Sequence, residues 1–273
     1  MALVNDTTFP RVSVQMITYN HAPYIAQAIE GVMAQKTNFT FELVISDDCS
    51  SDGTREICRQ YAERYPDKIK LLLPEKNLGM SANAALCMAN CKGEYIAICE
   101  GDDYWTEPFK LQKQVDFLDM NAEYAFCCHR FKCYNQENGT WSDDYAALYY
   151  KDGEDLEITR KLFFQTWITH PLTTVYRRSM RNLTIESKYK NFRDIHLFYS
   201  LLKRGKGISF NSFMGVYRMH MGGVSSKVDK VKNHRTQWNI YYSLWKRNWS
   251  DVELTKILAI KSIVMIKLLF MRK

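Results

Sequence analysis

The sequence predicts an α/β protein with a mostly parallel central sheet flanked by helices and a helical extension at its C-terminus. Strand-like and helix-like segments alternate four times between residues 12 and 99. Parallel strands need crossover connections, and the helices in these connections cover the faces of the sheet. The strand-like segments are also rich in apolar residues, which is typical of strands buried on both faces. With 46% hydrophobic residues among 273, the chain can form one large domain or two lobes.

The elements of the first half follow from periodicity and from turn residues. VSVQMI is a β-branched apolar run, and Ile25, Ala28, Ile29 and Val32 then recur at helical spacing. The turns TYNHAP, DDCSSDG, PEKNLG and CKG separate the later elements. We expect strands over residues 12–17, 41–46, 68–73 and 95–99, and helices over 24–35, 54–65, 81–90 and 110–118.

The second half is less regular, because turn-rich segments interrupt its hydrophobic pattern. Residues 124–134 alternate as in a strand, and residues 135–153 are rich in turn formers. We expect further strands over 172–176 and 214–219, and helices over 195–202, 232–247 and 251–271.

Polar side chains follow three of the four predicted N-terminal strands. In parallel α/β sheets, ligands bind beyond the carboxyl ends of the strands, so these groups should share one rim. The three groups are Thr18, Tyr19 and Asn20; Asp47, Asp48 and Asp52; and Glu100, Asp102 and Asp103.

The segment EGDD places three carboxylates within four residues, directly after a buried strand. A hard divalent cation, Mg²⁺ or Mn²⁺, would relieve the repulsion between these carboxylates. The same cation can bind a diphosphate and stabilise its negative charge as it leaves. The alternative is a solvated turn in which Asp103 caps a helix near Thr106. In the segment SDDCSSDGT, Asp48 is suited to a base N–H or a ribose hydroxyl, and Asp52 to turn chemistry.

Several motifs resemble the consecutive signatures of family 2 glycosyltransferases, in order and at normal spacing. They are VSVQMITYN, FELVISDDCSSDGT, NLGMSANAALCMANCKGEYIAICEGDDYW and KLQKQVDFL. FRDIHLFYSLLKRGKGISF and VYRMHMGGVS are similar to the second half of members that build bacterial surface polysaccharides. The resemblance covers residues 11–226.

The resemblance implies a GT-A fold and an inverting transfer from a nucleoside-diphosphate sugar, with UDP as the usual carrier, to a hydroxyl of a glycan or lipid-linked acceptor. It implies a catalytic domain over residues 1–226, with a nucleotide-binding half (1–103) and an acceptor half (104–226), followed by a basic helical extension (227–273). The implied nucleotide contacts are Thr18, Tyr19, Asn20, Asp48 and Asp102, with Asp102 and Asp103 at the metal and diphosphate and Asp194 as catalytic base.

Asp194 stands at the start of a predicted helix, where the helix N-terminus favours an ionised carboxylate, as a general base requires. The alternative is an ordinary helix cap. Late in the chain, His220 is a candidate third metal ligand or diphosphate contact, and Arg218 could neutralise phosphate. Trp105 could stack on the donor sugar or anchor the core, and His170 is expected to be structural.

Two departures from the family pattern affect the donor site. Glu100 replaces the Asp that often begins the acidic motif, which leaves open the carboxylate that touches the metal. Ala84 and Ala85 stand where the family often has an Arg-Asn pair, so a donor contact is lost or supplied elsewhere.

The net charge of +7 is concentrated near the C-terminus, where residues 203–273 hold 15 of the 37 basic but only 3 of the 30 acidic residues. This asymmetry, with Trp238, Trp245 and Trp249, is compatible with an anionic membrane surface. The alternative is that the helices pack on the domain or on a second subunit as a homodimer. The acidic rim argues against a nucleic-acid partner.

The first ten residues lack a basic stretch followed by an apolar run, so we expect no signal peptide and a cytoplasmic protein, peripheral to the inner face of the membrane. We therefore expect the eight cysteines to be reduced, buried thiols, including Cys87 and Cys91, which stand at helical spacing.

Two rival functions remain at this point. A sugar nucleotidyltransferase would usually carry a Gly-rich basic loop after the first strand, and TYNHAP contains no glycine. A catalytically inactive nucleotide-sugar-binding or assembly scaffold would need neither the metal carboxylates nor Asp194.

Overall fold

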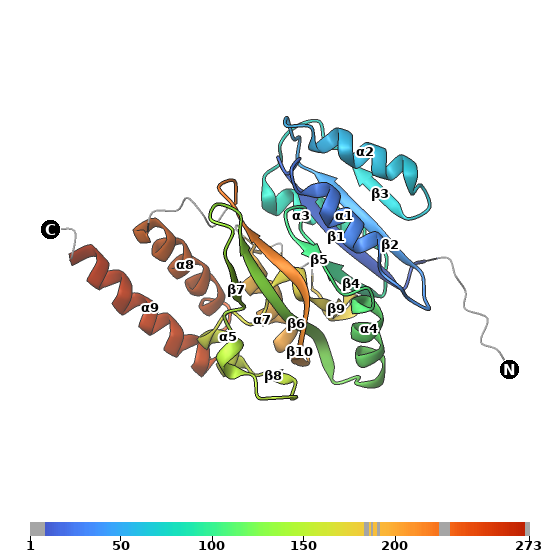
Figure 1. The fold of residues 1–273 in the computed structure, drawn as a ribbon. Coiled ribbons are helices and arrows are strands. Elements are labelled where there is room, and N and C mark those ends of the chain that lie inside the picture. Colours follow the sequence, from blue (N-terminus) through green and yellow to red (C-terminus); the bar gives the residue numbers. More distant parts are fainter. Residues whose placement is uncertain (1–8, 183–185, 187, 190–191, 224–229, 271–273) are drawn as a thin grey trace.

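The computed structural model describes residues 9–182, 186, 188–189, 192–223 and 230–270 (Figure 1). A ten-stranded sheet runs through the molecule in the order β3-β2-β1-β4-β9-β6-β10-β5, with β7 beside β6 and β8 beside β10. The strands are β1 (Val12–Thr18), β2 (Phe41–Asp47), β3 (Ile69–Leu72), β4 (Tyr95–Ile98), β5 (Tyr104–Trp105), β6 (Tyr124–Asn135), β7 (Trp141–Asp143), β8 (Leu156–Ile158), β9 (Val175–Arg177) and β10 (Lys206–Met219).

The first four strands are parallel, as predicted, and β1 lies between β2 and β4. The register pairs Val12 with Phe41 and Thr18 with Asp47, so β1 and β2 end side by side. Beyond β4 the pairing changes, because β9 runs antiparallel to both β4 and β6. The α/β fold with parallel central strands is therefore confirmed, and the antiparallel strands from β9 onward make the sheet as a whole mixed.

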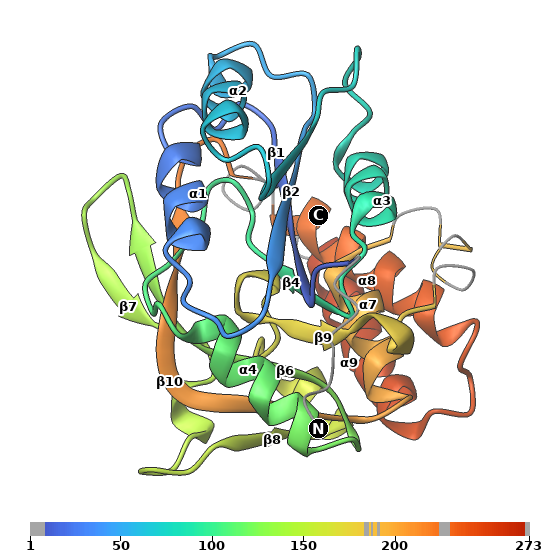
Figure 2. The same ribbon diagram turned by 90° about the vertical axis from the view of Figure 1, so that its right-hand side faces the viewer.

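Helices cover both faces of the sheet (Figure 2). Two apolar cores lie between the helices and the sheet. One core lies under α1 (Ile25–Met33), α2 (Thr54–Arg64) and α4 (Lys110–Met120). The other lies under α3 (Met80–Asn90), α5 (Arg160–Gln165), α7 (Asp194–Leu202), α8 (Lys230–Trp245) and α9 (Val252–Phe270). The two cores fix the sheet, and with it the positions of the strand ends.

Several elements after residue 103 differ from the sequence prediction. Residues 172–176 are not one strand, because Pro171 opens a 3-10 turn, η2 (Pro171–Thr173), before β9 begins. The predicted strand over 214–219 is only the end of β10. Register shifts against β6 near Phe210 and Phe213 interrupt its alternation, which hides its first half in the sequence. The short strands β5, β7 and β8 had no clear signal.

The two C-terminal helices pack against each other and against the rest of the fold, at the left of Figure 1. The Trp238 and Trp245 indoles donate to Ser262 and Thr255 across the pair, at 2.8 and 3.1 Å. Ile260, Ile263 and Ile266 stay more than half exposed on α9. Within the described part of the chain, none of the helices combines the length and apolar character needed to cross a bilayer.

All eight cysteines are free thiols, and seven of them are buried, as predicted. The Cys91 thiol lies 3.4 Å from the Cys87 carbonyl oxygen, an arrangement of two packed side chains at the end of α3. The predicted domain boundary at residues 226 and 227 lies outside the described residues.

Candidate active site

The three predicted polar groups meet at the carboxyl ends of β1, β2 and β4. The Asp48 amide donates to the Thr18 carbonyl at 2.9 Å, and the Gly101 amide donates to the Ile17 carbonyl at 3.0 Å. Gly101 has no space for a side chain, since a Cβ there would lie 2.7 Å from the Thr18 hydroxyl oxygen. This close approach brings the acidic turn against the end of β1 and confirms the shared rim.

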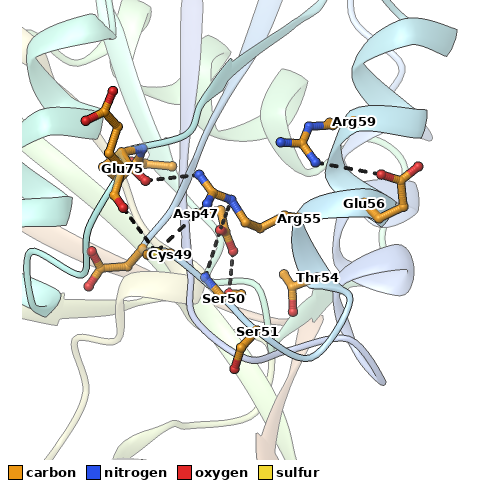
Figure 3. A network of polar contacts seen from close by, with 12 residues as sticks. Asp47, Cys49, Ser50, Ser51, Thr54, Arg55, Glu56, Arg59 and Glu75 are labelled. Carbon is orange, nitrogen blue, oxygen red and sulfur yellow. Dashed lines mark hydrogen bonds and ion pairs between the residues drawn. The ribbon is translucent and has the colours of Figure 1, made fainter.

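A buried network stabilises the loop after β2 (Figure 3). The Asp47 carboxylate accepts from the Ser50 amide at 3.1 Å and from its hydroxyl, and it lies 3.2 Å from Arg55 Nε. Arg55 also donates to the Pro74 carbonyl at 3.0 Å, which joins this loop to the segment before α3. Asp52 accepts from the Ala22 and Thr54 amides and is structural, as predicted.

The nucleotide contacts implied by the resemblance differ in their exposure. Tyr19 is 48% exposed, whereas Thr18 and Asp48 are buried. The Asp48 carboxylate accepts from the Leu78 and Gly79 amides at 2.7 and 2.9 Å and so ties the start of α3 to the rim. Asn20 has a left-handed backbone (φ 55°), and its side chain accepts from the Ser51 amide at 3.0 Å. These contacts hold the rim together, and contact with a nucleotide stays a prediction.

Arg218, at the end of β10, holds the acidic turn in place. Its backbone amide donates to Asp103 Oδ1, and its Nε donates to the Asp102 carbonyl, both at 2.9 Å. The guanidinium carbon lies 4.9 Å from the centroid of the Tyr24 ring and 5.0 Å from the centroid of the Tyr104 ring. Burial raises the pKa of Asp103 well above its ordinary value. Arg218 thus positions the turn, and its contact with a diphosphate stays a prediction.

Asp102 lies between two histidines. His220 Nε2 is 3.2 Å and His21 Nε2 is 3.6 Å from the same oxygen, Asp102 Oδ2. Burial opposes ionisation of Asp102, but the hydrogen bond from His220 and the charges of both histidines outweigh it and lower its pKa. His21, Asp102 and His220 could together bind a divalent cation, because one ligand atom from each residue lies within 4.8 Å of the others.

Glu100 also lies beside Asp102, because one carboxylate oxygen from each of Glu100, Asp102 and Asp103 lies within 4.8 Å of the others. Burial, together with the charges of Asp102 and Asp194, raises its pKa to about 8, while Arg193 opposes the rise. The structure therefore brings Asp194, about ninety residues away in sequence, close enough to the acidic turn for its charge to act on Glu100. Asp194 begins α7, as predicted.

The electrostatic prediction for Asp194 was incomplete. The amide groups at the start of α7 favour its ionised form, but burial has the larger effect and raises its pKa. Raising the pKa of a carboxylate strengthens it as a base, while the side chain stays partly exposed at the rim.

Trp105 is 3% exposed, and its indole donates to the Leu172 carbonyl at 2.8 Å. This geometry favours the core-anchor alternative over stacking on a donor sugar. His170 is also buried, accepts from the Leu172 amide at 3.2 Å and is structural, as expected.

Two residues of the site had no signal in the sequence. His21 directly follows the predicted nucleotide contacts, but a single histidine in a turn does not by itself indicate a metal site. Arg193 precedes Asp194 and lies against the start of α3, 3.5 Å from Met80 Sδ. Arg193 supplies a cation near the place where Ala84 and Ala85 replace the Arg-Asn pair.

Comparison with known proteins agrees with this arrangement. The profile of Glycosyl transferase family 2 matches residues 13–183, and the chain belongs to this family. An uncharacterized Mycobacterium tuberculosis protein is 35% identical over 83% of the chain, and the match spans 64% of that protein. The Bacillus subtilis protein named "Putative teichuronic acid biosynthesis glycosyltransferase TuaG" is 28% identical over 90% of this chain and 95% of its own length.

Two solved structures share the fold. S. aureus TarS 1–349 in complex with UDP-GlcNAc has a TM-score of 0.69 at 20% identity, covering 92% of this chain and 71% of that one. The mannosyltransferase PcManGT from Pyrobaculum calidifontis, in complex with GDP-Man and Mn²⁺, has a TM-score of 0.61 at 18% identity, covering 88% and 65%. The chain thus has the GT-A type of α/β fold, as predicted from its motifs.

Proposed function

We propose that this chain is an inverting glycosyltransferase that moves a sugar from a UDP-linked donor to a hydroxyl of a glycan or lipid-linked acceptor in surface polysaccharide synthesis. The observation that carries the proposal is the approach of the start of α7 to the acidic turn after β4. The charges of Asp102 and Asp194 both act on the Glu100 carboxyl, and Arg193, beside Asp194, lies 3.5 Å from Met80 Sδ at the start of α3. Family membership and the likeness to TuaG support the same function.

In this proposal the rim binds the donor. Thr18, Tyr19, Asn20 and Asp48 hold the nucleoside, and Tyr19 and Asn20 are the exposed members of this set. A divalent cation, Mn²⁺ or Mg²⁺, held by Asp102 and His220 with Asp103 nearby, would offset the negative charge of the departing diphosphate.

Asp194 is proposed to take the proton from the acceptor hydroxyl. Its carboxylate lies at the start of a helix that the second core fixes, and burial raises its pKa. The acceptor oxygen then attacks the anomeric carbon from the face opposite the diphosphate, so that the C–O bond to the diphosphate breaks as the new one forms. This displacement inverts the anomeric configuration.

The organisation of the chain follows from the same proposal. Residues 1–103 would bind the nucleotide, residues 104–226 the acceptor, and residues 227–273 would form a basic extension. Basic residues and the exposed Ile260, Ile263 and Ile266 of α9 support attachment of a cytoplasmic enzyme to an anionic membrane. Alternatively, a second copy of the chain packs on the same helices and forms a homodimer.

Calorimetric titration of UDP, GDP and dTDP with and without Mn²⁺ tests the donor site. We expect metal-dependent binding of UDP by the wild type and its loss in Asp102→Asn. Lys113→Met, an exposed change on α4, is the matched control and should bind UDP normally. Failure of the folded wild type to bind any of the three nucleotides would refute the proposal. Nucleotide binding with no transfer or donor hydrolysis would favour the inactive binding protein.

A further inference from the structure

His21 lies in the turn between β1 and α1, and its backbone is held firmly. Its amide donates to the Thr54 hydroxyl at 2.8 Å, and its carbonyl accepts from the Tyr24 and Ile25 amides at 2.8 and 2.9 Å. The imidazole is therefore directed from a fixed turn toward the acidic rim, where its Nε2 faces Asp102.

The two imidazoles face one carboxylate oxygen at, or 0.2 Å beyond, the separations expected of metal ligands. Ligand atoms about 2.1 Å from one ion lie roughly 3.0 to 3.4 Å apart in octahedral and tetrahedral geometry. His220 Nε2 and His21 Nε2 lie 3.2 and 3.6 Å from Asp102 Oδ2. The His21 contact is longer than a hydrogen bond, and its buried Nδ1 has no hydrogen-bond partner among the described residues.

The surroundings of His220 fix the second imidazole. The Tyr24 ring packs on it with centroids 4.6 Å apart, and the rings of His21 and His220 meet edge to face at 6.0 Å. The His220 side chain is 5% exposed, so its imidazole is shielded from bulk solvent while its Nε2 faces Asp102. Residues 21, 102 and 220 therefore form a preorganised set from three separate parts of the chain.

We propose that His21 is a metal ligand, and that His21, Asp102 and His220 form a two-histidine, one-carboxylate site selective for first-row transition metals over Mg²⁺. Nitrogen ligands favour these ions, whereas Mg²⁺ prefers oxygen ligands. For an N₂O set, affinity should rise from Mg²⁺ to Mn²⁺ to Co²⁺. This inference identifies the class of cation in the proposed donor site. It rests on the proposed function only for the role of the ion in offsetting the charge of the diphosphate.

Metal binding by the full chain, measured without and with UDP, tests the inference. Mn²⁺ titration followed by electron paramagnetic resonance should give one site in the wild type, and His21→Gln should weaken it by about tenfold or more. Pulsed resonance of the bound Mn²⁺ should detect two imidazole nitrogens in the wild type and one in the variant. His234→Gln, on α8 outside this set, is the matched control and should bind Mn²⁺ as the wild type does.

The outcomes separate this inference from the donor-site proposal. Mn²⁺ binding that is unchanged in His21→Gln, or a single nitrogen signal in the wild type, overturns the ligand assignment even if UDP binds. Mg²⁺ that competes equally with Mn²⁺ overturns the selectivity. Absence of Mn²⁺ binding by the folded wild type, both with and without UDP, overturns the site. Binding of Mn²⁺ through His21 without any binding of nucleotides supports the site and refutes the donor proposal.

Discussion

Lys110 is a fully buried lysine whose ammonium nitrogen has no hydrogen-bond partner among the described residues. It is the first residue of α4, where the helix dipole disfavours a cation. Its Nζ lies 4.0 Å from the centroid of the Trp105 ring. Burial lowers the pKa of Lys110 from 10.5 to about 7, so we expect replacement by the uncharged Met to stabilise the fold.

The size of the effect follows from the pKa. Each pKa unit corresponds to about 1.4 kcal/mol, so a fall from 10.5 to about 7 costs roughly 5 kcal/mol at neutral pH. Lys110→Met keeps the volume of the side chain and removes the charge, so it should raise the free energy of unfolding at pH 7 by several kcal/mol, up to about 5 kcal/mol.

The pH dependence gives a second test. The folded state loses its proton near pH 7 and the unfolded state near 10.5, so the penalty is complete below pH 7 and disappears as pH rises to 10.5. Urea unfolding at pH 7 and pH 9 should therefore show a smaller gain at the higher pH. Lys113→Met, on the exposed part of the same helix, should change stability by only about 0.5 kcal/mol. A less stable Lys110→Met at pH 7 would refute this reasoning.

Three further predictions concern the site and its supports. Asp194→Asn should lower turnover at least about a hundredfold while UDP affinity by calorimetry stays unchanged, and equal loss of both would refute its assignment as base. Gly101→Ala should cost about 1–3 kcal/mol by thermal unfolding and weaken Mn²⁺ binding, because its Cβ meets the Thr18 side chain; an unchanged melting temperature would contradict the close approach. Burial lowers the pKa of His196 to about 4, so its contribution to stability is complete above pH 6.5 and falls by about 1.4 kcal/mol per pH unit down to 4. In urea unfolding, His196→Gln should reduce the fall in the free energy of unfolding between pH 6.5 and 4. An unchanged fall would show that other groups cause it.

Much of the first half of the fold was predictable because each element is local. The apolar run of β1, the helical spacing from Ile25 to Val32 and the intervening turns fix the elements, and parallel pairing then places three strand ends on one rim. The acidic turn and Asp194 were found by motif. The second half was less predictable, because the register shifts in β10 and the antiparallel insertion of β9 depend on pairing between distant segments.

The sequence by itself determined the α/β class, the family and the residues around which a donor site could form. Only the tertiary structure decided how these residues act together. It joined His21 and His220 to Asp102, committed Arg218 to holding the turn, and buried Trp105 in the core. Periodicity and motif spacing report which residues follow each strand. Convergence across 200 residues, and the burial that sets the pKa values of Glu100 and Asp194, arise only when both cores are packed.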